Sequence, residues 1–118
     1  WGVVTNKPDF LTQPLMQKLS LNQRCACIVS GDTLAKNKPD PAPMFYAAKL
    51  AGCEASECIY VGDAERDIEA GRRAGMHTLI ARYGYIKNDD DPDQWQADGN
   101  LDHPAELIDW LCNCKAIV

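Results

Sequence analysis

The stretch 58–75 restricts the fold of this chain more than any other segment. Within it, Ile59–Val61 is an apolar, β-prone run typical of a buried strand, and Gly62 allows a sharp turn after it. A helical pattern follows and ends at a glycine, so Asp63 and Asp67 stand where a strand passes into a helix. Ligands of open α/β sheets bind at that edge, and acids four residues apart can face one crevice there.

Two interpretations of these acids stay open. Mg²⁺ takes one or two carboxylates and keeps its other positions for water and phosphate oxygens, so Asp63 and Asp67 suit a magnesium site. Alternatively, Asp63 caps the helix, and Asp67 stabilises the dipole of its first turn. The stretch by itself does not choose between metal binding and helix capping.

The remainder of the chain alternates strand-like with helix-like patterns. Pro14 is expected to limit or kink the first helix, and the segment 84–100 is polar and rich in turn residues. Alternation of this kind predicts a parallel sheet in a doubly wound α/β fold. The predicted strands are 2–4, 25–30, 58–62 and 77–82, and the predicted helices are 8–19, 43–51, 64–75 and 104–114.

Composition and charge argue against several classes of protein. The 118 residues suffice for one domain with its own core, and a net charge of −5 without a basic run disfavours a nucleic-acid partner. No apolar stretch reaches the length of a membrane span, about 20 residues, and no signal peptide opens the chain. The six cysteines lack Cys-x-x-Cys spacing, so we expect reduced thiols in the cytoplasm rather than a zinc site or disulfides.

Polar groups follow three of the predicted strands, and a lysine stands in a loop between them. Thr5–Asn6, Asp32 and Asp63 come directly after strands, and Lys38 lies in the loop after the second strand. Parallel strands bring their carboxyl ends to one edge, where a hydroxyl, an ammonium and a metal-binding acid would suit a phosphoryl group. Each group also has a plainer interpretation: a cap of the first helix for Thr5 or Asn6, an Asx-turn for Asp32, and a solvated side chain for Lys38.

The order of these motifs is more specific than any one of them. Thr-Asn-Lys-Pro at 5–8, Gly-Asp-Thr followed by Lys-Pro-Asp-Pro within 31–41, and Val-Gly-Asp-x-x-x-Asp at 61–67 resemble the haloacid-dehalogenase-like (HAD) phosphohydrolases. Within that family the resemblance is to the phosphoglycolate phosphatase group, and it covers essentially the whole chain. A downstream segment, 81–104, looks most like the N-acetylmuramic acid 6-phosphate phosphatases of peptidoglycan recycling.

The resemblance implies a fold, a reaction and a set of roles. The fold is a HAD-like, Rossmann-like three-layer sandwich, and the reaction is Mg²⁺-dependent hydrolysis of a small phosphorylated metabolite or phosphosugar through an aspartyl-phosphate. Thr5 and Lys38 match catalytic positions that also hold the phosphate, and Asn6 is expected to assist phosphate binding. Asp63 matches the Mg²⁺ ligand, and Asp67 supports it by orienting Asp63, its water or Lys38.

One departure from the family is serious. The family's nucleophile is the first Asp of an Asp-x-Asp motif after an N-terminal strand, and no such motif follows a strand here. The cap segment is absent too, so residues 1–118 are expected to be the carboxyl-terminal part of a phosphatase core domain, inactive alone. The missing strand would lie between the strands beginning at Gly2 and Ile59. Direct pairing of those strands, self-association or pairing with another chain, or a segment outside this sequence would have to close the gap.

Two other classes of function are kept as alternatives. A phospho-accepting receiver domain has a similar length and also combines Asp, Thr and Lys around Mg²⁺, although its lysine follows the last strand. A non-catalytic fragment retained as an interaction module is the second. A receiver would acquire an acid-labile phosphate from a phosphoryl donor, whereas an interaction module would bind its partner regardless of Asp63→Asn.

Overall fold

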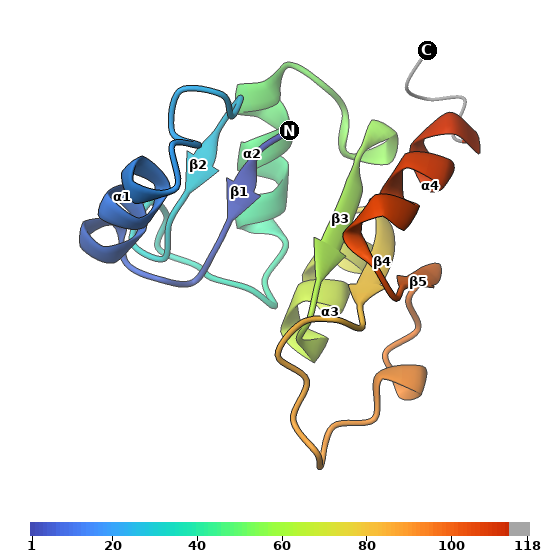
Figure 1. Cartoon of the computed structure of the whole chain (residues 1–118). Helices are drawn as coiled ribbons and strands as arrows, with labels where there is room; N and C mark the ends of the chain where they lie inside the picture. The colour runs from blue at the N-terminus through green and yellow to red at the C-terminus, as the bar shows by residue number, and fades with distance from the viewer. Residues whose placement is uncertain (114–118) are drawn as a thin grey trace.

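The strands of the computed structural model, which describes residues 1–113, all run parallel but lie in two separate sheets (Figure 1). One sheet has the order β1-β2 and the other the order β3-β4-β5. The prediction of an α/β fold with parallel strands is therefore confirmed. The strands are β1 (Val3–Val4), β2 (Ile28–Val29), β3 (Ile59–Gly62), β4 (His77–Ala81) and β5 (Gly99–Leu101).

Helices connect and flank these strands (Figure 1). Helix α3 packs on β3 and β4, and α4 lies on the opposite face of that sheet. None of the helices in the described part of the chain has the length and apolar character needed to cross a bilayer. The helices are α1 (Asp9–Lys18), α2 (Ala42–Ala51), α3 (Glu65–Arg73) and α4 (Leu107–Asn113), with short 3-10 turns η1 (Ala55–Glu57), η2 (Pro92–Gln94) and η3 (Pro104–Glu106).

Two expected element boundaries differ from the structure. Pro14 lies inside α1 without ending it, so the expectation that it limits the helix is wrong. The strand expected over 25–30 is regular only at β2, yet backbone bonds from the Ala26 amide to the Trp1 carbonyl (2.7 Å) and from Thr5 to Val29 (2.9 Å) continue the pairing on both sides. The ladder is thus nearly as long as predicted but irregular at its ends.

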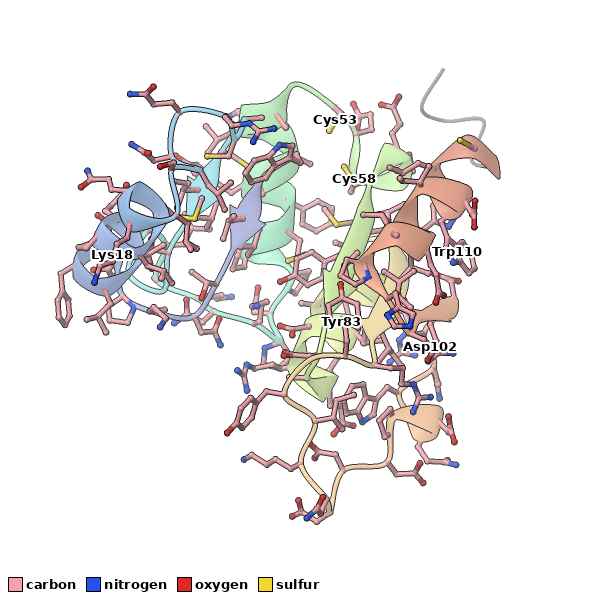
Figure 2. All side chains as sticks on the ribbon, viewed as in Figure 1. Lys18, Cys53, Cys58, Tyr83, Asp102 and Trp110 are labelled. Atoms are coloured by element: carbon pink, nitrogen blue, oxygen red, sulfur yellow. The ribbon has the colours of Figure 1, made fainter. Side chains whose placement is uncertain are left out.

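β5 is an element that the sequence pattern did not reveal. The segment 84–100 is polar and rich in turn residues, and no strand is predicted there, but its end joins β4 as a third parallel strand. Leu101 is fully buried there, and the Trp110 indole of α4 lies so close to Gly99 that a Cβ would stand 2.3 Å from it. Trp110 is seen on α4 in Figure 2. A three-residue strand with one large apolar side chain has too little pattern to be recognised locally.

The last helix buries less than its apolar residues suggest. The helix predicted over 104–114 begins as η3 and continues as α4, and its expected end at Cys114 lies outside the described residues. The apolar pattern of this helix predicts that it buries Leu107, Ile108 and Leu111. In the structure Ile108 is 62% exposed and Leu111 is 38% exposed, so the prediction is wrong for these two side chains. The sheet beneath α4 ends at the short strand β5, which offers little surface to cover them.

A buried cluster joins the two sheets. Met44 and Ala48 of α2 pack with Ala70 of α3, and Val4 of β1 and Tyr60 of β3 pack against them. The two sheets therefore share core contacts although β1 and β3 do not pair within the described residues. Direct pairing of these strands, one of the three expected ways to close the gap, is wrong.

Candidate active site

One pocket of about 500 Å³ opens at the carboxyl ends of β1 and β3. Parallel strands place their carboxyl ends on the same side, which explains why residues so distant in sequence meet there. All five residues proposed from the sequence line this pocket: Thr5, Asn6, Lys38, Asp63 and Asp67. Their convergence was expected, whereas their individual roles stay predictions.

Lys38 is held by three partners. Its Nζ donates to Asp67 Oδ1 (2.6 Å), to the Tyr60 hydroxyl (2.9 Å) and to the Val4 carbonyl (3.1 Å). An ammonium has three N–H donors, so each one has an acceptor. The Lys38 side chain is 6% exposed, which contradicts the plainer interpretation of a solvated lysine.

Asp67 uses both of its carboxylate oxygens. Oδ1 forms the ion pair with Lys38, and Oδ2 accepts from the backbone amides of Asp63 and Ala64, both at 3.2 Å. Asp67 therefore caps the start of α3 and orients Lys38 at the same time, whereas the Asp63 side chain does not cap that helix. With both oxygens occupied, Asp67 is a poor direct metal ligand.

Gly62 is required for this arrangement by space rather than by a left-handed backbone. A Cβ on Gly62 would stand 2.3 Å from the Asp67 Cβ, closer than real Cβ contacts come. Glycine is thus needed at position 62 less for the expected sharp turn than because Asp67 comes so close to the strand.

Asn6 clasps the backbone of Lys38. Its Nδ2 donates to the Lys38 carbonyl (3.1 Å), and its Oδ1 accepts from the Lys38 amide (3.2 Å). Thr5 Oγ1 accepts from the Lys7 amide (3.1 Å), which leaves its own hydroxyl hydrogen available to a ligand. Neither side chain caps α1, so that alternative is wrong.

The first amide of α1 donates to a side chain from a distant loop, that of Asp32. Asp32 Oδ1 accepts from the Asp9 amide at 2.9 Å, whereas an Asx-turn would bond within its own loop. The Asx-turn expected at Asp32 is therefore wrong: its carboxylate does accept a backbone amide, but that amide belongs to α1. Asp32 thus binds the first amide of α1, the helix that follows Thr5, and does not line the pocket.

Asp63 is the carboxylate in the pocket with room for a metal ion. Its Oδ2 accepts from the Tyr85 amide (2.9 Å), and no residue in 1–113 donates to its other oxygen. Gly84 approaches so closely that a Cβ there would meet the Asp63 Cβ at 2.6 Å, so the loop after β4 packs on this acid. Within the same residues, no group of three or more His, Cys, Asp or Glu side chains is arranged to hold a metal. One carboxylate still fits Mg²⁺, which fills its other positions with water and phosphate.

Sequence reasoning missed three residues of this site. Tyr60, Lys7 and Arg66 also line the pocket. The Tyr60 hydroxyl donates to the Val4 carbonyl (2.9 Å) and accepts from Lys38, so it ties β3 to β1. Burial raises the pKa of Tyr60 well above its usual range, and Asp67 and Asp63 raise it further. In the sequence Tyr60 has the appearance of an ordinary strand residue, and no local signal sets it apart.

The pocket has a net positive charge. Its lining carries three cations, Lys7, Lys38 and Arg66, and two carboxylates, Asp63 and Asp67. Asp67 is paired with Lys38, and the five charged residues together leave one net positive charge in the lining. Such a balance favours an anion, and a carboxylate at its rim favours an anion bound together with a cation.

Fold and site together define an α/β protein with a positively charged pocket at the carboxyl ends of β1 and β3. A family model described as haloacid dehalogenase-like hydrolase matches residues 1–81, and the chain belongs to this family. This confirms the family resemblance drawn from the motif order.

Named relatives agree with this assignment. The chain is 50% identical over 107 residues to a phosphoglycolate phosphatase of Xanthomonas campestris pv. campestris, a match that covers 91% of this chain and 48% of the relative. It is 46% identical over 118 residues to the N-acetylmuramic acid 6-phosphate phosphatase of Pseudomonas aeruginosa, covering 97% of this chain and 52% of that protein. The chain thus spans about half the length of the curated relatives it matches.

Solved structures show the same fold. A predicted phosphoglycolate phosphatase from Haemophilus somnus 129pt superposes with a TM-score of 0.85 at 30% identity, covering 92% of this chain and 48% of that one. A HAD phosphatase from Thermococcus onnurineus has a TM-score of 0.80 at 23% identity, covering 93% and 49%. The second, at its low identity, supports the fold alone.

Proposed function

We propose that this chain forms the carboxyl-terminal part of the catalytic core of a Mg²⁺-dependent phosphomonoester hydrolase. Its substrate is a small phosphorylated metabolite or phosphosugar, the class to which phosphoglycolate and N-acetylmuramic acid 6-phosphate, named in the relatives, belong. Activity on the phosphosugar would serve peptidoglycan recycling. The free thiols of Cys25, Cys27, Cys53, Cys58 and Cys112 suit a reducing compartment, so we place the enzyme in the cytoplasm.

The observation that carries the proposal is the buried ion pair of Lys38 and Asp67, because it lies next to a hydroxyl and a carboxylate that can contact a ligand. The pair lies in the same pocket as the Thr5 hydroxyl and the Asp63 carboxylate. A buried pair costs desolvation energy, and such a cost is common where a charge must be held ready for a ligand. The cationic excess of the lining is what a phosphate requires.

Each residue then has a defined task. Lys38 holds positive charge close to the phosphate oxygens. Its position is fixed by hydrogen bonds to Asp67 and Tyr60 and by the two bonds between Asn6 and its backbone. The Thr5 hydroxyl donates to a phosphate oxygen. Asp63 would hold Mg²⁺, and the bound ion would neutralise the negative charge that develops on the phosphoryl oxygens. The nucleophilic carboxylate of an aspartyl-phosphate route is none of these residues.

Binding of inorganic phosphate to the 118-residue chain tests the proposal without requiring turnover. We expect amide NMR shifts of residues around Thr5 and Asp63 on titration with phosphate, with tighter binding when MgCl₂ is present. Asp63→Asn should abolish the magnesium effect, and Lys38→Met should weaken phosphate binding by about tenfold or more, a loss of about 1.4 kcal/mol.

Lys49→Met is the matched control because Lys49 lies on α2 outside this pocket. Its phosphate affinity should equal that of the unmodified chain. Equal affinities of the Lys38→Met and Lys49→Met variants would contradict the proposed role of the pocket.

A further inference from the structure

Two cysteines lie side by side at the far end of β3 from the phosphate pocket. The Sγ atoms of Cys53 and Cys58 are 3.3 Å apart, and both side chains are partly exposed thiols. Figure 2 shows the two residues on the connection that leads from α2 to β3. This connection is where the chain passes from the β1-β2 sheet to the β3-β4-β5 sheet.

The intervening turn holds the two sulfur atoms in register. Residues 54–57 form η1 with its capping residue, in which the Glu54 amide donates to Glu57 Oε1 (3.0 Å) and the Glu57 amide donates to the Glu54 carbonyl (3.0 Å). The Cys58 amide closes the turn by donating to the Ala55 carbonyl (3.0 Å). A disulfide requires about 2.05 Å between sulfur atoms, so each sulfur has to move by less than about 1 Å.

A small molecule can reach one of the two thiols. Cys53 lines a surface hollow of about 370 Å³ that Phe45, Lys49 and Glu57 also border. Cys58 does not line this hollow and instead packs, with Cys53, against the cluster that joins the sheets. Both thiols are partly exposed, but a molecule bound in the hollow would meet Cys53 first.

We propose that Cys53 and Cys58 form a reversible dithiol–disulfide pair that reacts with low-molecular-weight disulfides. The Cys53 thiolate attacks one sulfur of the small disulfide, forms a mixed disulfide and releases the first small thiolate. The Cys58 thiolate then attacks the Cys53 sulfur, which forms the Cys53–Cys58 disulfide and releases the second small thiolate. Two protein thiols are oxidised, one small disulfide is reduced, and the two protons go to the released thiolates.

The order of attack follows from the surroundings of the two thiols. Burial, followed by the contact with Cys53, raises the pKa of the Cys58 thiol to about 12. Cys58 is therefore a thiol at neutral pH, and the first attack falls to the accessible Cys53. Once Cys53 is in a mixed disulfide, its sulfur lies next to the Cys58 sulfur, so the second attack is intramolecular.

The bond would close the short turn between α2 and β3, at the end of β3 opposite the phosphate pocket. Closing a loop this short stabilises the folded chain modestly, through the unfolded state. The expected consequence is a rise of about 5 °C in the midpoint of thermal unfolding after oxidation. This inference is independent of the proposed phosphatase function.

The folded 118-residue chain treated with excess oxidised glutathione tests the pair. Trypsin releases peptide 50–66, which contains Cys53 and Cys58 and no other cysteine. In the unmodified chain we expect this peptide to lose two hydrogens, to resist alkylation and to regain both thiols with dithiothreitol. Cys58→Ser should stop at a glutathione adduct on Cys53, whereas Cys53→Ser should leave Cys58 as a free thiol.

Three results would overturn the inference. The first is a stable glutathione adduct on peptide 50–66 of the unmodified chain, and the second is two thiols that still react with an alkylating reagent. The third is a Cys53–Cys58 disulfide accompanied by a lower midpoint of thermal unfolding, since it would show that the bond forms only by distorting the fold.

Discussion

At the scale of single residues, Lys38 and Asp67 show how one contact can serve both stability and chemistry. Their side chains are 6% and 8% exposed, and they are 2.6 Å apart. Taking two charges out of water is costly, so the pair is stable only while both members and their further hydrogen bonds are present. Asp67 retains two backbone amides and Lys38 retains the Tyr60 hydroxyl and the Val4 carbonyl, which supply those bonds.

We predict that Asp67→Asn lowers the free energy of unfolding by about 3 kcal/mol, because it leaves the Lys38 ammonium buried without a counter-charge. The asparagine oxygen can still accept from the Asp63 and Ala64 amides, so the loss reports on charge. Lys38→Met in the same chain should restore at least about 1 kcal/mol, since the two changes are coupled. Urea unfolding of both single variants and the double variant measures this; strictly additive losses would contradict the coupling.

Tyr60 should make stability depend on alkaline pH. Its pKa is raised in the folded chain, so the folded state holds this proton more tightly than the unfolded state does. The stabilisation is complete below the unfolded pKa, about 10, and declines as the pH rises further, by up to about 1.4 kcal/mol per unit. Tyr60→Phe should cost about 1 kcal/mol at pH 7 by removing the bonds to Val4 and Lys38.

Unfolding of the unmodified and Tyr60→Phe chains at pH 7, 10 and 11 measures this effect. The advantage of the unmodified chain should shrink between pH 10 and pH 11. An advantage that stays constant over this range would show that Tyr60 does not titrate as the structure implies.

At the scale of elements, α1 begins with a capping residue that belongs to another segment. Its N-cap position is Pro8, whose side chain cannot accept a hydrogen bond, and the Asp9 amide binds Asp32 Oδ1 instead. Ser30 Oγ also donates to the Asp9 carboxylate (2.8 Å), so the loop after β2 and the start of α1 hold each other. The helix that follows Thr5 is thus anchored by tertiary contacts.

Asp32→Ala should destabilise the chain by about 1 kcal/mol, as the loss of an N-cap usually does. Asp32→Asn keeps an acceptor for the Asp9 amide and loses only the charge, so it should recover most of that stability. Thermal unfolding of the two variants at pH 7 compares them. If both variants lost stability equally, the charge rather than the hydrogen bond would be responsible.

At the scale of the whole molecule, the residues that line the pocket come from two sheets that do not pair within residues 1–113. The Val4 carbonyl, on the β1 strand, receives hydrogen bonds from Lys38 and Tyr60 side chains in place of a neighbouring strand. The described residues therefore form a pocket in which Asp63 is the carboxylate that keeps an oxygen without a hydrogen-bond donor. Asp63 contacts the loop after β4, and Asp67 has both oxygens engaged.

We predict that the purified 118-residue chain releases no inorganic phosphate from p-nitrophenyl phosphate in the presence of MgCl₂. In the proposed site Asp63 holds the metal ion and Asp67 has both oxygens engaged, so neither carboxylate is left to become an aspartyl-phosphate, and an enzyme of this kind cannot turn over without that step. The same sample should bind inorganic phosphate, which would show that an inactive chain still has an intact site. A magnesium-dependent burst of phosphate would contradict the prediction.

The sequence alone determined the α/β class, the family and five of the polar and charged residues that meet in the pocket. Strand and helix periodicities are local properties, and parallel strands with short connections carry their terminal residues to one edge whatever the details of packing. Thr5, Lys38 and Asp63 could be grouped for that reason before any coordinates were known.

Only the tertiary structure decided which side chains hold these groups in place and how the strands divide. The Tyr60–Val4 bond joins residues 56 apart, and the Asp32–Asp9 bond joins residues 23 apart. β5 is a strand because Gly99 and Leu101 pair with β4 and Gly99 packs against Trp110. Its three residues by themselves have little preference for a strand. Hydrogen bonds and burial between distant residues depend on the packed chain, so no local pattern contains them.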